Sequence, residues 1–557
     1  MTFQSKRVAV VGAGPSGLVT VKELLEEGHR PTCFERASNL GGVFRFSEDD
    51  GVVWESCRLT SSGLLTQFSD FPASPDETGH MTARQYVGYL TRYCETFNLT
   101  SHIRFNTTVE SVKRCSDGSW SAETRNGDVR NNEQFDAVAI CSGLHQHPSL
   151  PKLRGQERFA GTVFHGAQYR RPAQVSGKKV LIIGAGESGA DIVAEVSAHA
   201  AETVLSLRRG AAVLPRIMFG KPIDYQTSRV HNSAAHWVFQ TRNPKDDRKR
   251  TIYRWVCLPV VVVDKCLQIA FNFAWHILPQ FYASRLSEIR INLKTRKIAR
   301  QLLKESGGSI AEQFGTKTDE FVRAIAAGAC RRVPAVDRFE GARVWFTDGT
   351  HFEPDVVIFC TGFETRTRFL DGITCDSPRY LHTFNSKVGP SLGFIGFVRP
   401  AYGAIPPLAE LQARWFALVQ SGGLELPAEE EMRRSIEYWA RFRTHIFSAV
   451  RDRLDYLVDH TPFCDELAAR IGCKPTRDAI RRENLGFRLR FFAGPFVAAQ
   501  YRLVGPHAKP EIARGVIANL PIKHPLPDLI NLYLRWGMSR VLHRTLGPEF
   551  APKLEIR

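Results

Sequence analysis

The chain has 557 residues, a length that favours two to four domains over a single core. Its 43% hydrophobic and 24% charged residues are typical of a globular protein. The net charge of +17 is spread along the sequence, with one denser block at residues 242–254. A phosphate-bearing cofactor or an anionic membrane surface explains this charge as well as nucleic acid does, and no nucleic-acid partner is expected.

Cysteine spacing and the N-terminal sequence bear on chemistry and compartment. The 12 cysteines include no CxxC pair and no zinc-ligand spacing, which argues against a metal site, a dithiol redox centre and a secreted disulfide framework. The apolar stretch at residues 8–11 is too short for a signal peptide. We therefore expect a reducing, cytoplasmic compartment.

Residues 6–36 predict a strand, a tight glycine turn, a helix and a second strand. Gly12 permits the turn, Gly14 lets a pyrophosphate approach the backbone, and Gly17 lets the helix pack on the strand. The helix N-terminus then presents free N–H groups to the phosphates. Glu35 follows 18 residues after Gly17 and is suited to accept both ribose hydroxyls of an adenosine. The stretch predicts a dinucleotide-binding fold.

The same pattern returns further along, where Gly184, Gly186 and Gly189 follow an apolar strand and precede a helix expected at residues 190–199. Arg208 lies 19 residues after Gly189, close to the spacing of Glu35 in the first copy. A carboxylate suits free ribose hydroxyls, whereas an arginine suits a 2′-phosphate. The exchange predicts FAD in the first copy and NADPH in the second. The alternative for Arg208 is a plain surface charge.

Two further buried strands, at residues 136–143 and 355–363, end in small-residue turns and indicate that the first domain resumes after the second. We expect an α/β fold with two Rossmann-type domains, the second inserted in the first, plus a mainly helical insertion and C-terminal extension. The expected parts are an FAD domain (1–155 and 336–425), an NADPH domain (156–220 and 301–335), an insertion (221–300) and an extension (426–557).

The insertion fits neither copy. Residues 255–279 are apolar and aromatic, but two charges and two prolines argue against a spanning helix, which needs about 20 apolar residues. Basic residues flank the stretch on both sides. Peripheral membrane contact and a buried helical subdomain over the substrate entrance are equally weighted alternatives. The apolar segment 527–544 is more simply a helix packed on its own protein.

Between the two copies, Phe159, Gly161, His165, Tyr169 and Arg170 fit the pattern FxGxxxHxxxY(K/R). With residues 41–42, 68–72, 360–363, 410–414 and 500–506, this motif makes the chain resemble the flavin-containing monooxygenases, or dimethylaniline monooxygenase-like proteins, of class B. The resemblance extends to about residue 520. The related Baeyer–Villiger enzymes carry Trp where Tyr169 stands. Two positions depart from the family: Thr60 replaces the usual Asn and Phe44 the usual Trp.

The resemblance implies NADPH reduction of FAD, followed by transfer of one oxygen atom from a flavin C4a-hydroperoxide to nitrogen or sulfur of a small nucleophilic substrate. O2 is the second substrate, and a homodimer is one option for assembly. The alternatives are Baeyer–Villiger oxygenation of a ketone and, more remotely, a flavin-dependent NADPH oxidase or reductase. No metal is needed. His165 is more simply a structural hydrogen-bonding residue than a catalytic one.

The residues expected at the site fall into three groups. Thr60, Ser61 and Tyr169 are expected at the junction of flavin and nicotinamide. The FAD contacts are expected from Gly12, Ala13, Gly14, Pro15, Ser16, Gly17, Glu35, Arg36, Gly42, Val43, Phe44, Thr60, Ser61, Val109, Thr361, Gly362 and Gln412. The NADPH contacts are expected from Gly184, Gly186, Glu187, Ser188, Gly189, Ala190, Asp191, Ser206 and Arg208.

Overall fold

The computed structural model describes residues 5–218, 220–229, 286–307, 313–373, 377–447 and 455–522. The chain divides into two compact units, each described by itself. The first comprises Met1–Arg216 and Arg290–Ile471, and the second comprises Ile217–Ile289 and Gly472–Arg557.

The first unit contains a seven-stranded sheet with the order β20-β21-β22-β7-β1-β2-β3. Its strands are β1 (Arg7–Val11), β2 (Arg30–Phe34), β3 (Ile103–Arg104), β7 (Ala137–Ile140), β20 (Arg379–Tyr380), β21 (Phe384–Asn385) and β22 (Leu392–Phe394). The central strands run parallel, and β1 and β7 are apolar and almost wholly buried. Continuous apolar runs are what a parallel sheet covered on both faces requires.

A second, five-stranded sheet of the same unit has the order β14-β11-β10-β18-β9, with every pair parallel. Its strands are β9 (Thr162–His165), β10 (Lys179–Ile183), β11 (Glu202–Ser206), β14 (Arg331–Val333) and β18 (Val356–Phe359). All five come between β7 and β20 in the chain. The second domain is therefore inserted in the first, and the predicted fold class is confirmed.

One predicted boundary is wrong. Residues 336–359 were expected to return to the first domain, but β18 pairs with β10 and β9 of the second sheet. The first sheet resumes only at β20. The error arose because β7 and β18 are equivalent strands, each beside the first strand of its own copy, and their sequences look alike.

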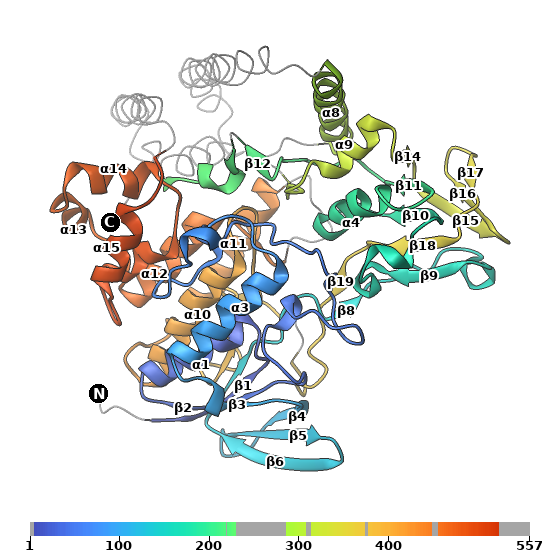
Figure 1. Ribbon diagram of the computed structural model, residues 1–557. Helices are drawn as coiled ribbons and strands as arrows, with labels where there is room; N and C mark the ends of the chain where they lie inside the picture. The colour runs from blue at the N-terminus through green and yellow to red at the C-terminus, as the bar shows by residue number, and fades with distance from the viewer. Residues whose placement is uncertain are drawn as a thin grey trace. The chain divides into compact units, whose positions relative to one another are not determined.

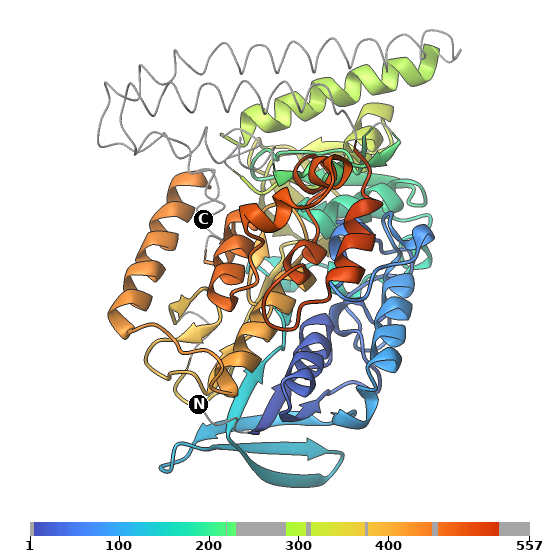
Figure 2. The same cartoon turned by 90° about the vertical axis from the view of Figure 1, so that its left-hand side faces the viewer.

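Helices cover both sheets (Figure 1). In the first domain, α1 (Pro15–Glu26) packs against α10 (Ile405–Gln420) and α3 (Ala83–Thr96), as Figure 2 also shows from the side. In the second, α4 (Glu187–Ser197) packs against α9 (Glu320–Ala327), and Leu302 of α8 (Leu286–Glu305) joins the same core. The helices α11 (Glu429–Ile446) and α12 (His460–Ile471) complete the unit.

Smaller antiparallel sheets extend both domains. The strands β4 (Thr108–Arg114), β5 (Trp120–Asn126) and β6 (Val129–Phe135) form one, and β15 (Val336–Glu340), β16 (Arg343–Phe346) and β17 (His351–Phe352) form another. Two pairs of short strands link distant segments: β8 (His147–Pro148) with β19 (Phe363–Glu364), and β23 (Arg399–Pro400) with β24 (Leu457–Val458).

The second unit is mainly helical where it is described. It contains β12 (Ile217–Met218), β13 (Lys221–Pro222), η7 (Ile223–Gln226), α13 (Arg477–Arg481), α14 (Leu485–Ala493), η10 (Ala498–Arg502) and α15 (Pro510–Ala518). Arg229 lies among three rings, 5.1, 4.9 and 5.4 Å from the centroids of Phe491, Phe496 and Tyr501. This buried guanidinium ties the start of the insertion to the C-terminal extension.

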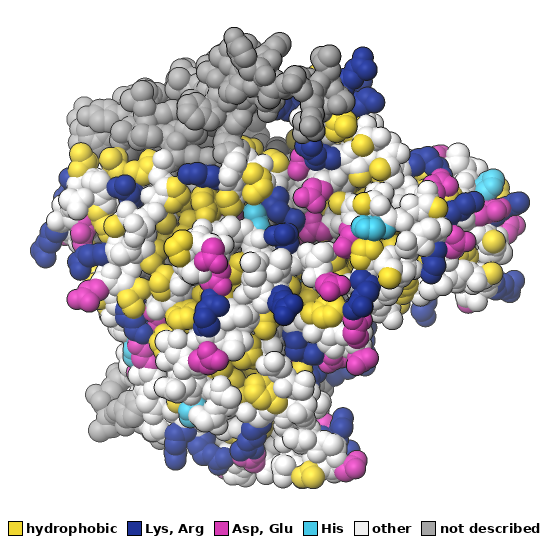
Figure 3. Space-filling model, viewed as in Figure 1, with side chains coloured by type: hydrophobic (Ala, Val, Ile, Leu, Met, Phe, Trp, Pro, Cys, Tyr) yellow, Lys and Arg dark blue, Asp and Glu magenta, His cyan; other side chains and the backbone are white. Residues whose placement is uncertain are grey.

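The predicted membrane-contact stretch, residues 255–279, and the apolar segment 527–544 lie outside the described residues. Within the described part of the chain, no helix combines the length and apolar character that crossing a membrane requires. On the coloured part of the face in Figure 3, Lys and Arg side chains lie among acidic ones instead of gathering in one patch.

Candidate functional site

The glycine loop between β1 and α1 leaves no room for side chains. Gly12 has a φ of +103°, and a Cβ on it would lie 3.0 Å from the carbonyl oxygen of Cys141. A Cβ on Gly17 would lie 1.8 Å from the carbonyl oxygen of Gly12. Gly14 is the N-cap of α1 and supplies no capping side chain, so the first N–H groups of the helix remain for an oxyanion.

Glu35 lies directly beside this loop. One carboxylate oxygen accepts the N–H of Ala13 at 2.7 Å, and the other accepts the N–H of Ala37 at 2.9 Å. The side chain is buried at the end of β2. Each oxygen keeps a further lone pair, so the fixed carboxylate is able to accept two ribose hydroxyls.

A second glycine turn lines the same loop. Gly41 and Gly42 have φ values of +119° and +56°, and the N–H of Gly41 donates to the carbonyl of Ala13 at 3.1 Å. The short helix η1 (Gly42–Phe44) places Val43 and Phe44 next, and the Phe44 ring meets Tyr86 edge-on at 4.9 Å. This arrangement brings the predicted residues 42–44 beside the predicted residues 12–17.

The loop between β10 and α4 repeats the first loop closely. Gly184 has a φ of +98°, and its Cβ would lie 2.7 Å from the carbonyl oxygen of Cys360. A Cβ on Gly189 would lie 2.5 Å from the carbonyl oxygen of Gly184. Gly186 is exposed with no atom near its missing Cβ. The helix begins at Glu187, three residues before the predicted start, so Glu187, Ser188 and Ala190 all lie in its first turn or just after it.

Strand register sharpens the comparison of Glu35 with Arg208. Val11 pairs with Phe34 in the first copy, and Ile183 pairs with Ser206 in the second. By this register, Leu207 takes the place of Glu35, and Arg208 takes the place of Arg36. Both arginines are exposed. The second copy therefore lacks the ribose carboxylate altogether and keeps the arginine that follows it.

Thr60 and Ser61 precede the short helix α2 (Gly63–Thr66). Ser61 is buried, and its hydroxyl lies 2.9 Å from that of Thr66. Thr60 is half-buried, and its hydroxyl makes no hydrogen bond to a described residue. The Thr60 hydroxyl therefore keeps its full hydrogen-bonding capacity, and the Ser61 hydroxyl keeps part of it.

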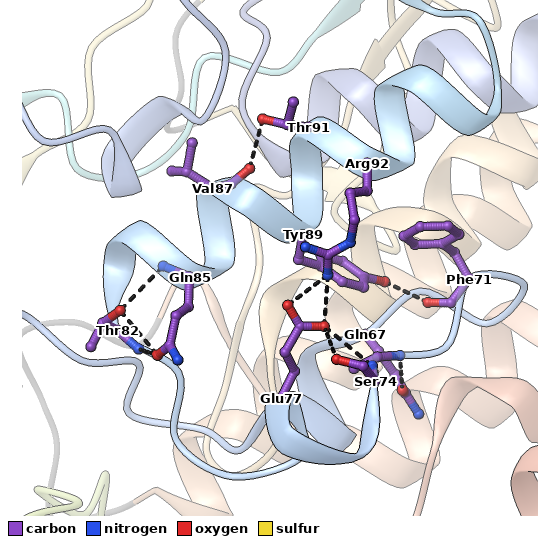
Figure 4. A network of polar contacts seen from close by, with 11 residues as sticks. Gln67, Phe71, Ser74, Glu77, Thr82, Gln85, Val87, Tyr89, Thr91 and Arg92 are labelled. Carbon is purple, nitrogen blue, oxygen red and sulfur yellow. Dashed lines mark hydrogen bonds and ion pairs between the residues drawn. The ribbon is translucent and has the colours of Figure 1, made fainter.

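A polar network holds this segment against α3 (Figure 4). Arg92 donates to both carboxylate oxygens of Glu77 at 2.6 and 2.7 Å, and the hydroxyl of Tyr89 donates to the carbonyl of Phe71 at 2.7 Å. Thr82 is the N-cap of α3, as predicted, and forms a capping box with Gln85. These contacts fix the loop that follows α2 against α3.

Three predicted contact residues are buried by the protein. Tyr169 is wholly buried in a core cluster that combines second-domain residues with Val53 and Trp54 of the first domain, and burial and the nearby Glu195 raise its pKa. Its expected place at the flavin–nicotinamide junction stays a prediction. Gln412 is also wholly buried; it accepts the N–H of Gly396 at 2.9 Å and donates to the carbonyl of Leu381. The Ser206 hydroxyl donates to the carbonyl of Pro334 at 2.7 Å.

Asp191 and His165 also have local partners. Asp191 receives two hydrogen bonds from Arg216, at 2.7 and 2.9 Å, while burial raises its pKa to about 6. His165 Nδ1 accepts the N–H of Ala167 at 3.1 Å, and burial lowers its pKa. This hydrogen bond supports the structural role expected of His165, which stays a prediction.

The remaining predicted residues lie at strand ends and edges. Thr361 follows β18 and donates to the carbonyl of Ser149, and Gly362 has a φ of +89°. Val109 is partly buried on β4 against the core of the first domain. One close contact was missed by sequence reasoning: a Cβ on Gly396 would lie 2.1 Å from the hydroxyl of Ser16, so this glycine lies against the first turn of α1.

The two loops fit dinucleotides. Each is a backbone cradle that a Cβ would fill, at a helix start with uncapped N–H groups, and only the first has the ribose carboxylate. A family model described as Flavin-binding monooxygenase-like matches residues 5–256 and 258–520. The chain belongs to this family, and it is a flavin-dependent oxidoreductase with FAD and NADPH as its cofactor pair. The resemblance predicted from the sequence is confirmed.

Individual relatives have different activities. The chain is 32% identical over 544 residues to a 4-hydroxybenzoate brominase (decarboxylating) of Marinomonas mediterranea, covering 96% of this chain and 97% of that protein. It is 32% identical over 521 residues to Flavin-containing monooxygenase 2 of Homo sapiens, covering 90% and 89%. The solved structure of S-allyl-L-cysteine S-oxygenase from Allium sativum has the same fold, with a TM-score of 0.59 at 21% identity over 97% of this chain and 100% of that one.

Proposed function

We propose that the protein uses NADPH and O2 to transfer one oxygen atom to a soft nucleophilic centre, nitrogen or sulfur, of a small organic substrate. The observation that carries the proposal is the pair of equivalent glycine loops, of which only the first has a ribose carboxylate. In this assignment Glu35 holds the FAD ribose and Arg208 the 2′-phosphate of NADPH. The first turns of α1 and α4 hold the two pyrophosphates.

The chemistry comes from the bound flavin, which supplies activated oxygen when it is reduced. The chain positions both dinucleotides and excludes water from the site. Thr60 and Ser61 are proposed to line the junction of the two cofactors, where Thr60 offers a hydroxyl as donor and acceptor. Tyr169 is left out of this set because its side chain is wholly buried by other residues of the protein.

Bromination is a second candidate, because two brominases match at 32% identity over 96% and 97% of this chain. Bromide is itself a soft nucleophile. Oxygen transfer to it balances as NADPH + O2 + Br⁻ + 2H⁺ giving NADP⁺ + HOBr + H2O, and the hypobromous acid brominates an electron-rich ring such as that of 4-hydroxybenzoate. The same two loops and the same cofactors serve both reactions.

One set of incubations separates these reactions. Purified protein with NADPH under ¹⁸O2 receives dimethylaniline, thioanisole, cyclohexanone, or 4-hydroxybenzoate with bromide, and mass spectrometry detects the products. We expect ¹⁸O in the N-oxide or sulfoxide. Brominated phenol without N- or S-oxide establishes the second candidate, and labelled lactone establishes a Baeyer–Villiger enzyme. NADPH consumption that yields only hydrogen peroxide contradicts all three and indicates an oxidase.

A further inference from the structure

A short segment joins the starts of the two dinucleotide helices. Gly396 lies against Ser16 at the first turn of α1, and Gln412 fixes it there by accepting its N–H. Three residues later, Arg399 donates to Oε2 of Glu187, the first residue of α4, at 3.5 Å. Three residues span at most about 11 Å. Arg399 of the first domain is therefore held at the loop of the second.

A lysine reaches the same place from a different segment. Thr316 donates through its N–H to the carbonyl of Ala212 at 2.7 Å and through its hydroxyl to the carbonyl of Ala185 in the second glycine loop. These bonds place the next residue, Lys317, beside Glu187, with Nζ 4.0 Å from Oε1. The Lys317 side chain is only 8% exposed.

The two cations are poorly satisfied by the protein. They share one carboxylate, and both contacts are at the outer limit of such interactions. Among described residues, the Lys317 ammonium makes no hydrogen bond and the Arg399 guanidinium makes one of the five it is able to donate. A largely buried lysine gains from a ligand that supplies hydrogen-bond acceptors to its ammonium.

An aromatic ring completes the arrangement. Phe314 lies under both cations, with its ring centroid 4.0 Å from the Arg399 guanidinium carbon and 5.5 Å from Lys317 Nζ. Stacking on the ring fixes the plane of the guanidinium and leaves its edge for hydrogen bonds. A planar guanidinium edge matches the two oxygens of a carboxylate.

We propose that Arg399 and Lys317 form an oxyanion subsite that binds the carboxylate of the substrate, so that the oxidised compound is an organic acid. The inference rests on the proposed function, whose substrate class it narrows. Glu187 occupies the subsite as an internal carboxylate and competes with the ligand. A phosphate of NADPH offers similar oxygen chemistry, and the experiment separates these two sources.

The test uses the matched thioethers 4-(methylthio)benzoate and thioanisole, which differ by one carboxylate. For the flavin-loaded wild type, we expect kcat/KM for the acid to exceed that for thioanisole at least tenfold. Arg399→Gln should lower kcat/KM for the acid about 10- to 100-fold, the range of charge-assisted hydrogen bonds, and leave thioanisole and the KM for NADPH within about twofold. Glu187→Gln should tighten binding of the acid. Arg343→Gln, an exposed arginine paired with Glu353, is the control and should change nothing.

Binding is measured separately from turnover, by calorimetric titration of the NADP⁺-loaded protein with 4-(methylthio)benzoate. If no thioether is oxidised but Arg399→Gln still weakens this binding, the proposed function fails and the subsite stands. If Arg399→Gln weakens NADPH and leaves the acid unchanged, the oxyanion is a dinucleotide phosphate and the inference is overturned. Equal kcat/KM for both thioethers in wild type and variant also overturns it, provided that Arg399→Gln keeps its bound flavin and Tm.

Discussion

The two dinucleotide folds share a backbone and differ in how they balance charge. In the first, Lys22 on α1 is 3% exposed and contacts the carboxylates of Glu23, Glu26 and Asp70. Counted from the first glycine of each loop, its equivalent in the second fold is Ala194. The second fold instead has Glu187 at the start of its helix, facing two cations from other segments. In the first fold one cation is surrounded by three carboxylates, whereas in the second two cations share a single carboxylate.

The three carboxylates around Lys22 are also close enough together to hold a metal ion. The lysine ammonium already takes the central place, within hydrogen-bond distance of each carboxylate. The cluster is therefore a structural ion network of the first fold, and its removal tests how far the two copies differ.

Replacing the third glycine of each loop should have the largest effect. Gly17→Ala is expected to lower the free energy of unfolding by about 4 kcal/mol or more, because its Cβ would lie 1.8 Å from a backbone oxygen. The Cβ of Gly189→Ala would lie 2.5 Å from the carbonyl oxygen of Gly184, so this variant should retain flavin but bind NADPH more weakly. Gly88→Ala, within α3, is the control, because its Cβ would lie in ordinary contact, 3.8 Å from an Arg92 side-chain nitrogen. Flavin content and urea denaturation measure how the two variants differ in flavin binding and stability. A Gly17→Ala protein that is stable and retains its flavin would contradict the prediction.

The buried ion network should come next. Lys22→Met is expected to destabilise the protein by about 3–5 kcal/mol, because it leaves buried carboxylates without their cation. Lys152→Met, at an exposed position, provides the matched control. Thermal and urea unfolding report the change, and equal stability of the two variants would show that the network contributes nothing to the first fold.

Nucleotide preference tests the register of the two arginines. Arg208→Ala should weaken NADPH by about 1.5–3 kcal/mol and leave NADH nearly unchanged, since it removes a charge-assisted contact to the 2′-phosphate. Arg36→Ala alters the equivalent position of the first copy and should not change the ratio of the two nucleotides. Steady-state KM values for NADPH and NADH decide the matter. If Arg208→Ala keeps the preference for NADPH over NADH, Arg208 does not bind the 2′-phosphate.

The smallest effect concerns the thiols that follow β7 and β18. Burial raises the pKa of Cys141 and of Cys360 to about 12 each. A thiol in the unfolded chain ionises near about 8.5, so each stabilises the fold fully below that pH and loses the contribution as pH rises toward 12. At pH 9.5 the loss is about 1.4 kcal/mol for each thiol. Cys141→Ala and Cys360→Ala should each reduce the difference in unfolding free energy between pH 7.5 and 9.5. An undiminished difference in either variant would show that the two thiols do not contribute equally.

Much of this architecture was predictable because glycine loops have strict steric requirements. At Gly12, Gly17, Gly184 and Gly189 the backbone leaves no room for a Cβ, so only glycine fits. The strands around these positions were predicted from apolar runs. The partnership of β18 was not predictable, since two apolar strands of equal length compete for the same kind of neighbour. Strand register was needed to see that Arg208 corresponds to Arg36.

Side-chain direction was the other limit. The family pattern identified Tyr169 and Gln412, but a motif does not tell whether a residue faces a ligand or a core, and both are wholly buried. Conversely, Lys317 and Arg399 belong to no glycine pattern and lie 82 residues apart. Only the fold brings them to one carboxylate. Their sole sequence signals were an aromatic three positions before Lys317 and a proline directly after Arg399.

The bridge from Gly396 to Arg399 makes the flavin a natural reporter for the rest of the site. Gly396 lies against the first turn of the helix proposed to hold FAD, and Arg399 contacts Glu187 beside the second glycine loop. A ligand that binds Arg399 and shifts it is therefore expected to change the surroundings of the flavin as well. The fluorescence of the flavin should then change when a substrate binds at Arg399 without contacting the isoalloxazine ring. Unlabelled compounds are then screened by flavin fluorescence.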